Sequence, residues 1–98
     1  MNIVIGTVES VEEIAGSEKL YKFMIDIGTE KRQVLGGLKL SYQPEELLNK
    51  QVLVIENLEP RKMMGTESQG MILAASNEDG KPVIIQPTKE VPNGSTIR

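Results

Sequence analysis

Turn-forming residues divide the 98-residue chain into short segments rich in β-forming side chains, and none of the segments has the pattern of a long helix. The clearest segment is 20–27, where Tyr21, Phe23, Ile25 and Ile27 occupy every second position. Side chains on a strand alternate between its two faces, so this spacing predicts a strand with these four residues facing a core. The turn at 28–30 then predicts a hairpin with the next segment.

The remaining segments follow the same reasoning. Further strands are predicted at 3–14, 31–35, 51–57, 70–76 and 83–85, with a polar loop at 60–69. Gly6 indicates a bend or bulge in the first strand. Pro44, followed by two acidic residues, predicts one helical turn at 44–48. About six short strands and one short helix indicate a mainly all-β chain folded as a small closed or partly closed β-barrel.

The composition excludes most catalytic chemistry. The chain has no cysteine and no histidine, so thiolate nucleophiles, cysteine-based zinc sites and the commonest general base are all missing. The acidic pairs at 12–13 and 45–46 are sequence neighbours on a strand and at a helix start, which suits neither an acid/base pair nor a metal cage. We therefore expect no catalytic residue, no metal and no cofactor.

The charge pattern bears on location and partners. No apolar run approaches the roughly 20 residues of a membrane span, and the N-terminus does not resemble a secretory signal, so a cytoplasmic protein without a membrane partner is expected. The formal net charge of −3 weighs against binding to random nucleic acid. Basic residues nevertheless cluster at Lys31–Arg32 and Arg61–Lys62, which predicts a locally basic face that relies on the shape of its ligand.

The most specific stretch is 57–75, with the sequence Asn-Leu-Glu-Pro-Arg-Lys-Met-Met-Gly-Thr-Glu-Ser-Gln-Gly-Met-Ile-Leu-Ala-Ala. It resembles the signature of the tRNA-binding OB domain found at the C-terminus of many methionyl-tRNA synthetases and in free-standing tRNA-binding proteins. Segments 16–21, 26–34, 42–47 and 91–94 also match this family, in the right order. The resemblance implies one domain over residues 1–98: a five-stranded OB-fold β-barrel with one short helix and extra C-terminal β-strands. One departure is Gly36, where the family usually has Ser.

The resemblance also implies a tRNA-binding role for Ser68 and Met71. A hydroxyl can bond phosphate or ribose, and a thioether can pack on a base. The alternative is that Ser68 caps a loop and Met71 begins the inner face of a strand, and the two readings stand about even. Polar and cationic candidates complete the predicted tRNA site: Lys19, one of Lys31 and Arg32, Asn57, Arg61 and Lys62. Adjacent residues on a strand point to opposite faces, so only one of Lys31 and Arg32 is expected to contact phosphate.

Relatives of this type are commonly homodimers joined through their terminal segments. The expected interface consists of Val83, Ile84, Ile85, Val91 and Ile97. A methionyl-tRNA synthetase catalytic chain is a further implied partner. An alternative comes from a related barrel family of secretion-associated chaperones, which bind unfolded peptides in an apolar groove. The segments 61–63 and 68–71 resemble the synthetase type more than the chaperone type.

Overall fold

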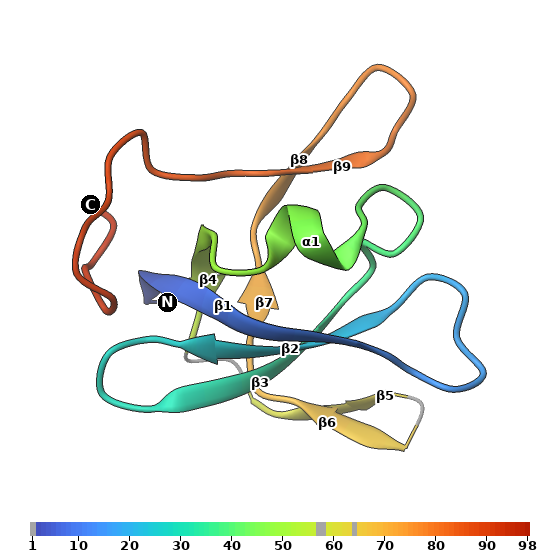
Figure 1. Ribbon diagram of the computed structural model, residues 1–98. Helices are drawn as coiled ribbons and strands as arrows, with labels where there is room; N and C mark the ends of the chain where they lie inside the picture. The colour runs from blue at the N-terminus through green and yellow to red at the C-terminus, as the bar shows by residue number, and fades with distance from the viewer. Residues whose placement is uncertain (1, 57–58, 64) are drawn as a thin grey trace.

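The computed structural model describes residues 2–56, 59–63 and 65–98, and only the backbone of Met63. These residues form nine strands and one short helix (Figure 1): β1 (Ile3–Glu13), β2 (Tyr21–Asp26), β3 (Lys31–Gly36), α1 (Pro44–Leu47), β4 (Gln51–Ile55), β5 (Arg61–Met63), β6 (Thr66–Ser68), β7 (Met71–Ile72), β8 (Ala74–Ser76) and β9 (Pro82–Ile84). Five of the strands form one antiparallel sheet in the order β3-β2-β1-β4-β7, which curls into a nearly closed barrel. The mainly all-β fold predicted from the sequence is therefore confirmed.

The long first strand serves both halves of the barrel. Its first part pairs with β4 and its second part with β2. The register shifts between Val8 and Ser10, which makes Glu9 the extra residue of a β-bulge, and a bulge bends its strand. Gly6 lies just before the bulge, and a Cβ there would come within 2.5 Å of Cγ2 of Ile25. The expected irregularity thus occurs at Glu9, whereas Gly6 allows β1 and β2 to pack closely.

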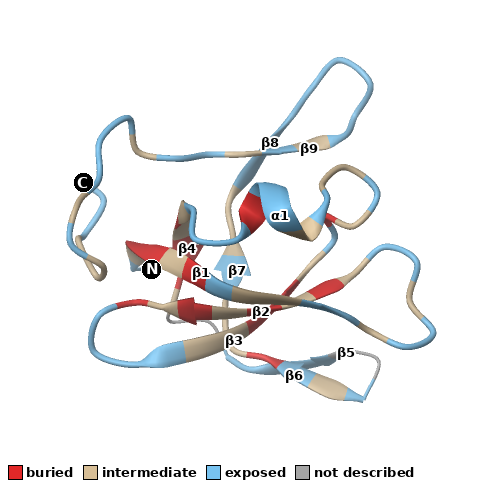
Figure 2. Cartoon of the chain, viewed as in Figure 1, coloured by how far each residue is buried: buried red, intermediate tan, exposed pale blue. Residues whose placement is uncertain are grey.

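The core lies inside the barrel, as Figure 2 shows by its buried strand segments. Tyr21, Phe23, Ile25 and Ile27 are all buried, which confirms the alternation predicted for 20–27. Leu47 of α1 is buried against the same cluster, so the helix covers one end of the barrel. Each such side chain stabilises the fold by about 1.5–3 kcal/mol through its removal from water.

Two predicted elements are wrong in detail. The segment 60–69 is not a loop, because β5 and β6 form a two-stranded hairpin with Gly65 in its turn at φ +76°. The segment 70–76 is not one strand, since β7 continues the barrel while β8 leaves it to pair with β9. Both hairpins lie outside the barrel, so their strands need no regular alternation of buried side chains. This missing alternation explains why the sequence predicts a loop for β5 and β6 and does not show the break between β7 and β8.

The C-terminal tail completes the exposed edge of β1, and Figure 1 shows it beside the first residues of that strand. The N–H of Gly94 donates to the carbonyl of Ile5 (2.7 Å), and the N–H of Ile5 donates to the carbonyl of Ser95 (3.0 Å). The side-chain amide of Gln51 also bonds both the N–H and the carbonyl of Val91. The tail is therefore held against the barrel by hydrogen bonds and forms part of the folded domain. Among the described residues, no helix is long and apolar enough to cross a membrane.

Candidate nucleic-acid interface

The connection between β4 and β7 carries the β5–β6 hairpin, which we call the β5–β6 arm (residues 61–68). Figure 1 shows the arm at the same end of the barrel as the β1–β2 connection, residues 14–20. In five-stranded barrels with a helix in mid-chain, oligonucleotides bind across strands 2 and 3 and the loops after strands 1 and 4. The arm and the β1–β2 connection occupy these two loop positions.

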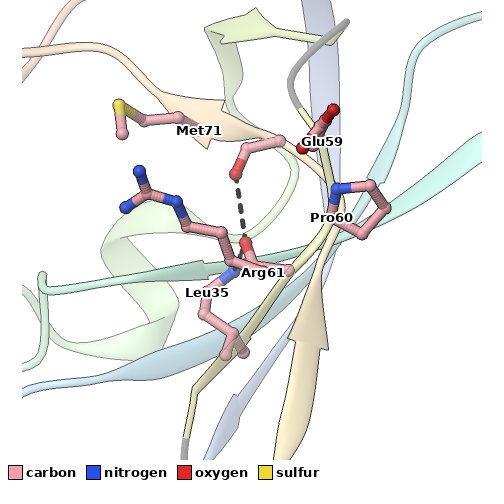
Figure 3. A pocket seen from close by; sticks show the side chains of 7 residues that line it. Leu35, Glu59, Pro60, Arg61 and Met71 are labelled. Atoms are coloured by element: carbon pink, nitrogen blue, oxygen red, sulfur yellow. Dashed lines mark hydrogen bonds between the residues drawn. The ribbon is translucent and has the colours of Figure 1, made fainter.

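A recess of about 260 Å³ opens where the arm meets the barrel. Its lining comes from β3, the arm and β7 (Figure 3): Leu35, Glu59, Pro60, Arg61, Ser68, Gly70 and Met71. Figure 3 shows the side chains of Arg61 and Met71 extending toward the same side of this recess. The recess therefore offers a cation and an apolar thioether together, which suits a phosphate with its sugar or base.

Ser68 lies at the back of the recess and is only 5% exposed. Its hydroxyl donates to the carbonyl of Gly70 (3.0 Å) and accepts the N–H of Leu35 (3.0 Å). A hydroxyl has a single hydrogen, so its donor capacity is fully used inside the protein. Only an acceptor lone pair is left for an RNA donor such as a ribose hydroxyl.

Met71 begins β7 but is 47% exposed, so it does not start the inner face of that strand. Its neighbour Ile72 packs against the core instead. The core alternative for Met71 is therefore wrong, while the role of Met71 in tRNA binding stays a prediction.

Two of the predicted cations are already engaged with the protein. The Nζ of Lys31 lies 3.0 Å from Oε1 of Glu9, and this hydrogen bond raises the pKa of the exposed Lys31. Arg32 forms an ion pair with Glu30, and its Nη1 donates to the carbonyls of Glu56 (2.6 Å) and Gln69 (3.1 Å). Arg32 lies on the same side of β3 as the buried Val34, so its guanidinium binds main-chain groups at the barrel end.

Three other predicted cations have no ion-pair partner in the part of the chain that the structure describes. Within the described part of the chain, Arg61, Lys62 and Lys19 form no ion pair. Arg61 lines the recess, and Lys62 is its neighbour on the strand and so points to the other face of the arm. Lys19 lies in the β1–β2 connection. The predicted contact Asn57 lies outside the described residues. Ranges 2–56, 59–63 and 65–98 contain no acidic cluster that could hold a metal ion.

Sequence reasoning missed the polar contacts that attach the arm to β3. The N–H of Gln69 donates to the carbonyl of Gln33 (2.7 Å), and the N–H of Gln33 donates to Oε1 of Gln69 (3.0 Å). The Nε2 of Gln33 also donates to the carbonyl of Glu67 (2.7 Å). No local pattern in the sequence predicts these contacts, because Gln33 lies 36 residues from Gln69 and 34 residues from Glu67.

Position 36 departs from the usual Ser of the family, and its surroundings are tight. A Cβ at Gly36 would lie 3.1 Å from Cε2 of the buried Phe23. A serine there would press against the ring, so glycine relieves the packing at the end of β3.

The predicted interface residues divide into two groups. Val83, Ile85 and Ile97 are exposed. Ile84 packs against the core, and its N–H donates to the hydroxyl of Tyr42 (3.1 Å). Val91 is half-buried and is held by Gln51. Three of the five predicted residues are thus available to a partner, and two are occupied within the chain.

The barrel order, the helix between its third and fourth strands and the cationic arm before its fifth define an OB-fold binding module. A family model described as "Putative tRNA binding domain" matches residues 3–96. The chain belongs to this tRNA-binding domain family.

Relatives of the chain include long and short proteins. The methionine–tRNA ligase of Methanothrix thermoacetophila is 49% identical over 98 residues, which are all of this chain but only 14% of the ligase. A MetRS related protein from Pyrococcus horikoshii has a crystal structure with a TM-score of 0.93 and 38% identity, covering 99% of this chain and 89% of that one. The chaperone CsaA of Bacillus anthracis has a TM-score of 0.88 and 31% identity, covering 99% and 90%. The same barrel thus occurs in proteins with different names, so function has to be argued from the site.

Proposed function

We propose that this chain is a non-catalytic domain that binds tRNA through the recess and the free cations of the β5–β6 arm. The observation that carries the proposal is the position of Arg61. It has no ion-pair partner among the described residues and lines the recess beside Met71, in a chain that belongs to the tRNA-binding domain family. In this proposal the whole of residues 1–98 acts as one binding domain in the cytoplasm.

Recognition would depend on the shape and backbone of the RNA. All three aromatic residues are engaged in the fold, since Tyr21 and Phe23 are buried and Tyr42 packs against the core. Proteins that hold single strands stack bases on exposed aromatic rings, and this chain offers none. A folded RNA can instead be bound through phosphates and ribose hydroxyls. Because the net charge is −3, binding would be modest and would weaken as salt rises.

The domain would act by delivering tRNA to a catalytic chain. Methionine–tRNA ligases contain a homologous segment as a small part of their length, so the chain fits an accessory domain or subunit of methionyl-tRNA synthetase. Tethering a weak tRNA binder to an enzyme raises the local tRNA concentration and lowers the apparent KM without altering the chemistry. A free-standing tRNA-binding protein would use the same surface.

A homodimer is part of the proposal. The exposed apolar side chains Val83, Ile85 and Ile97 lie on β9, just after it and in the tail. Figure 1 shows these segments away from the arm. Self-association would cover these side chains and would place two tRNA sites in one particle, which raises the apparent affinity for tRNA.

A second candidate is a chaperone that binds unfolded peptides, and the likeness to CsaA favours it. Leu40 is 70% exposed, and with Val83 it borders a surface hollow that could receive an apolar peptide. This candidate gives no role to Arg61 and Lys62, which form no ion pair within the described residues. The tRNA proposal accounts for both of these cations.

A salt titration tests the proposal. Binding of tRNA is compared with binding of a single-stranded RNA of equal length and of a reduced, unfolded polypeptide. Micromolar tRNA binding that exceeds single-strand binding and weakens as salt rises supports phosphate recognition by shape. Binding of the unfolded polypeptide without any preference for tRNA would reject the proposal in favour of the chaperone.

A further inference from the structure

The barrel closes in two physically different ways. Strands β3, β2, β1, β4 and β7 are joined in that order by backbone ladders, but among the described residues no ladder joins β7 back to β3. Gly70 packs into this gap, where a Cβ would lie 2.8 Å from the carbonyl of Ile55 and 3.6 Å from Cγ2 of Val34. The gap is too tight for a side chain at position 70. It is closed by the main-chain hydrogen bond from the N–H of Gln69 to the carbonyl of Gln33 (2.7 Å) together with hydrogen bonds made by side chains.

Besides the side chain of Gln69, which accepts the N–H of Gln33, three residues of different types make side-chain hydrogen bonds here. Gln33 donates from its side chain to the carbonyl of Glu67 (2.7 Å), at the base of the arm. Ser68 accepts the N–H of Leu35 (3.0 Å). Arg32 donates to the carbonyl of Gln69, the residue that links the arm to β7. All three bonds join β3 to the segment immediately before β7.

We propose that Arg32, Gln33 and Ser68 are positioning residues, which fix the orientation of the β5–β6 arm and thereby hold Arg61 at the recess for a phosphate of the bound RNA. This inference rests on the proposed function. Arg61 and Ser68 are opposite each other on paired strands, so a change in how β6 sits on β3 moves Arg61 directly. Arg32 and Ser68 thus serve tRNA binding through the arm rather than by touching phosphate.

The geometry distinguishes this role from direct contact. A direct hydrogen bond from RNA to the neutral Ser68 hydroxyl involves no counterion, so its loss lowers affinity equally at every salt concentration. A displaced Arg61 loses a phosphate contact, and each such contact contributes about 0.7–0.9 to the slope of log K against log salt. The salt slope therefore shows whether Ser68 and Gln33 act through the cation.

The test measures tRNA binding by the full chain over a series of salt concentrations, well below its melting temperature. The variants are Arg61→Ala, Gln33→Ala and Ser68→Ala. Lys81→Ala is the matched control. It also removes one cation that forms no ion pair among the described residues, but it lies in the β8–β9 connection, at the opposite end of the molecule from the arm in Figure 1. Gln33 does not line the recess, so its variant removes a brace without removing a lining residue.

We expect Arg61→Ala to lower the slope by about one unit. Gln33→Ala and Ser68→Ala should lower the slope in the same direction and weaken binding roughly three- to tenfold at low salt. Gln33→Ala should add little in the Arg61→Ala background, and Lys81→Ala should leave slope and affinity near those of the parent. If Ser68→Ala unfolds the chain, Gln33→Ala carries the test alone.

An unchanged slope in Gln33→Ala and Ser68→Ala, with Arg61→Ala reduced, would overturn the positioning role while leaving tRNA binding intact. Absence of tRNA binding by the parent chain would instead reject the proposed function. Amide hydrogen exchange separates these failures without RNA, because a braced arm predicts faster exchange at residues 61–68 in Gln33→Ala than in the parent. Equal exchange rates would contradict the brace itself.

Discussion

Two small hairpins project from the same barrel, and they differ in what they present to solvent. The β5–β6 arm exposes Arg61 and Lys62 and is attached to β3 by polar side chains. The β8–β9 hairpin exposes Val83 and is followed by the exposed Ile85. Figure 1 shows them at opposite ends of the molecule. A two-stranded hairpin can thus bind a polyanion or a protein surface, depending on the side chains that its strands carry.

Truncation after Gly80 has the largest expected effect on this comparison. It removes β9 and the tail, and with them the hydrogen bonds that Gly94, Ser95 and Ile97 share with β1. Each such bond contributes about 1 kcal/mol, so the loss reaches several kcal/mol out of the roughly 5–15 kcal/mol that stabilise a small domain. We expect an unfolded chain or a monomer, as measured by circular dichroism and analytical ultracentrifugation. A stable dimer after this cut would remove the second hairpin and the tail from the interface.

The next test replaces the exposed side chains of one hairpin at a time. Arg61→Ala with Lys62→Ala should weaken tRNA binding roughly tenfold or more at low salt, because two phosphate contacts are lost. Val83→Asp with Ile85→Asp should instead produce a monomer, because charge repels at an apolar interface. Binding isotherms and sedimentation, run on both double variants, give a crossed design in which each variant is the control for the other. If the aspartate variant is monomeric and no longer binds tRNA, the two hairpins do not have separate roles in RNA binding and self-association.

Much of the barrel could be predicted because its pattern is local. The alternation of Tyr21, Phe23, Ile25 and Ile27 is readable within eight residues, and the structure buries all four. The arm could not be predicted in this way, since its two strands bury no regular face. Its attachment depends on polar groups such as Gln33 and Glu67, which are 34 residues apart in the chain.

The candidate site shows the same division. The motif at 57–75 supplies most of the residues that line the recess, so the predicted site segment and the recess coincide. It could not separate free cations from engaged ones, because pairing depends on residues far along the chain. Arg32 looks like a phosphate contact beside Lys31, yet it donates to carbonyls 24 and 37 residues away. Arg61 looks no different in sequence and forms no ion pair with any residue that the structure describes.

A smaller effect is expected from the link between the core and the second hairpin. The Tyr21 hydroxyl donates to the carbonyl of Tyr42 (2.7 Å), and the Tyr42 hydroxyl accepts the N–H of Ile84 (3.1 Å). Tyr42→Phe should cost about 1 kcal/mol in the free energy of unfolding and speed amide exchange in β9, with no change in tRNA affinity. Faster exchange in the arm instead would show that the two hairpins are not independent.

The Tyr21 end of the same link also predicts that the stability of the fold decreases at alkaline pH. Burial raises the pKa of Tyr21 above its ordinary value of 10.0, with a further contribution from Glu13. The folded chain then holds the phenol proton at a pH where the unfolded chain has lost it, so the contribution of Tyr21 to stability is constant below about pH 10 and falls above it. Urea denaturation at pH 8–11 should show this fall in the parent and a flatter profile in Tyr21→Phe. An equally steep fall in the variant would assign the alkaline limit to other groups.

The smallest expected effect concerns a cation that the fold has partly neutralised. Lys31 is paired with Glu9 on the surface, and such exposed pairs contribute at most about 1 kcal/mol to stability. Glu9→Gln should leave the melting temperature almost unchanged and strengthen tRNA binding by less than threefold at low salt, because it frees Lys31 and removes one negative charge. Glu12→Gln is the matched control, since it frees Lys22 from an equivalent surface pair on the neighbouring part of the same strand. A gain confined to Glu9→Gln would place Lys31 at the edge of the RNA footprint. Equal gains in both variants would reflect net charge alone and leave the β5–β6 arm as the local cationic site.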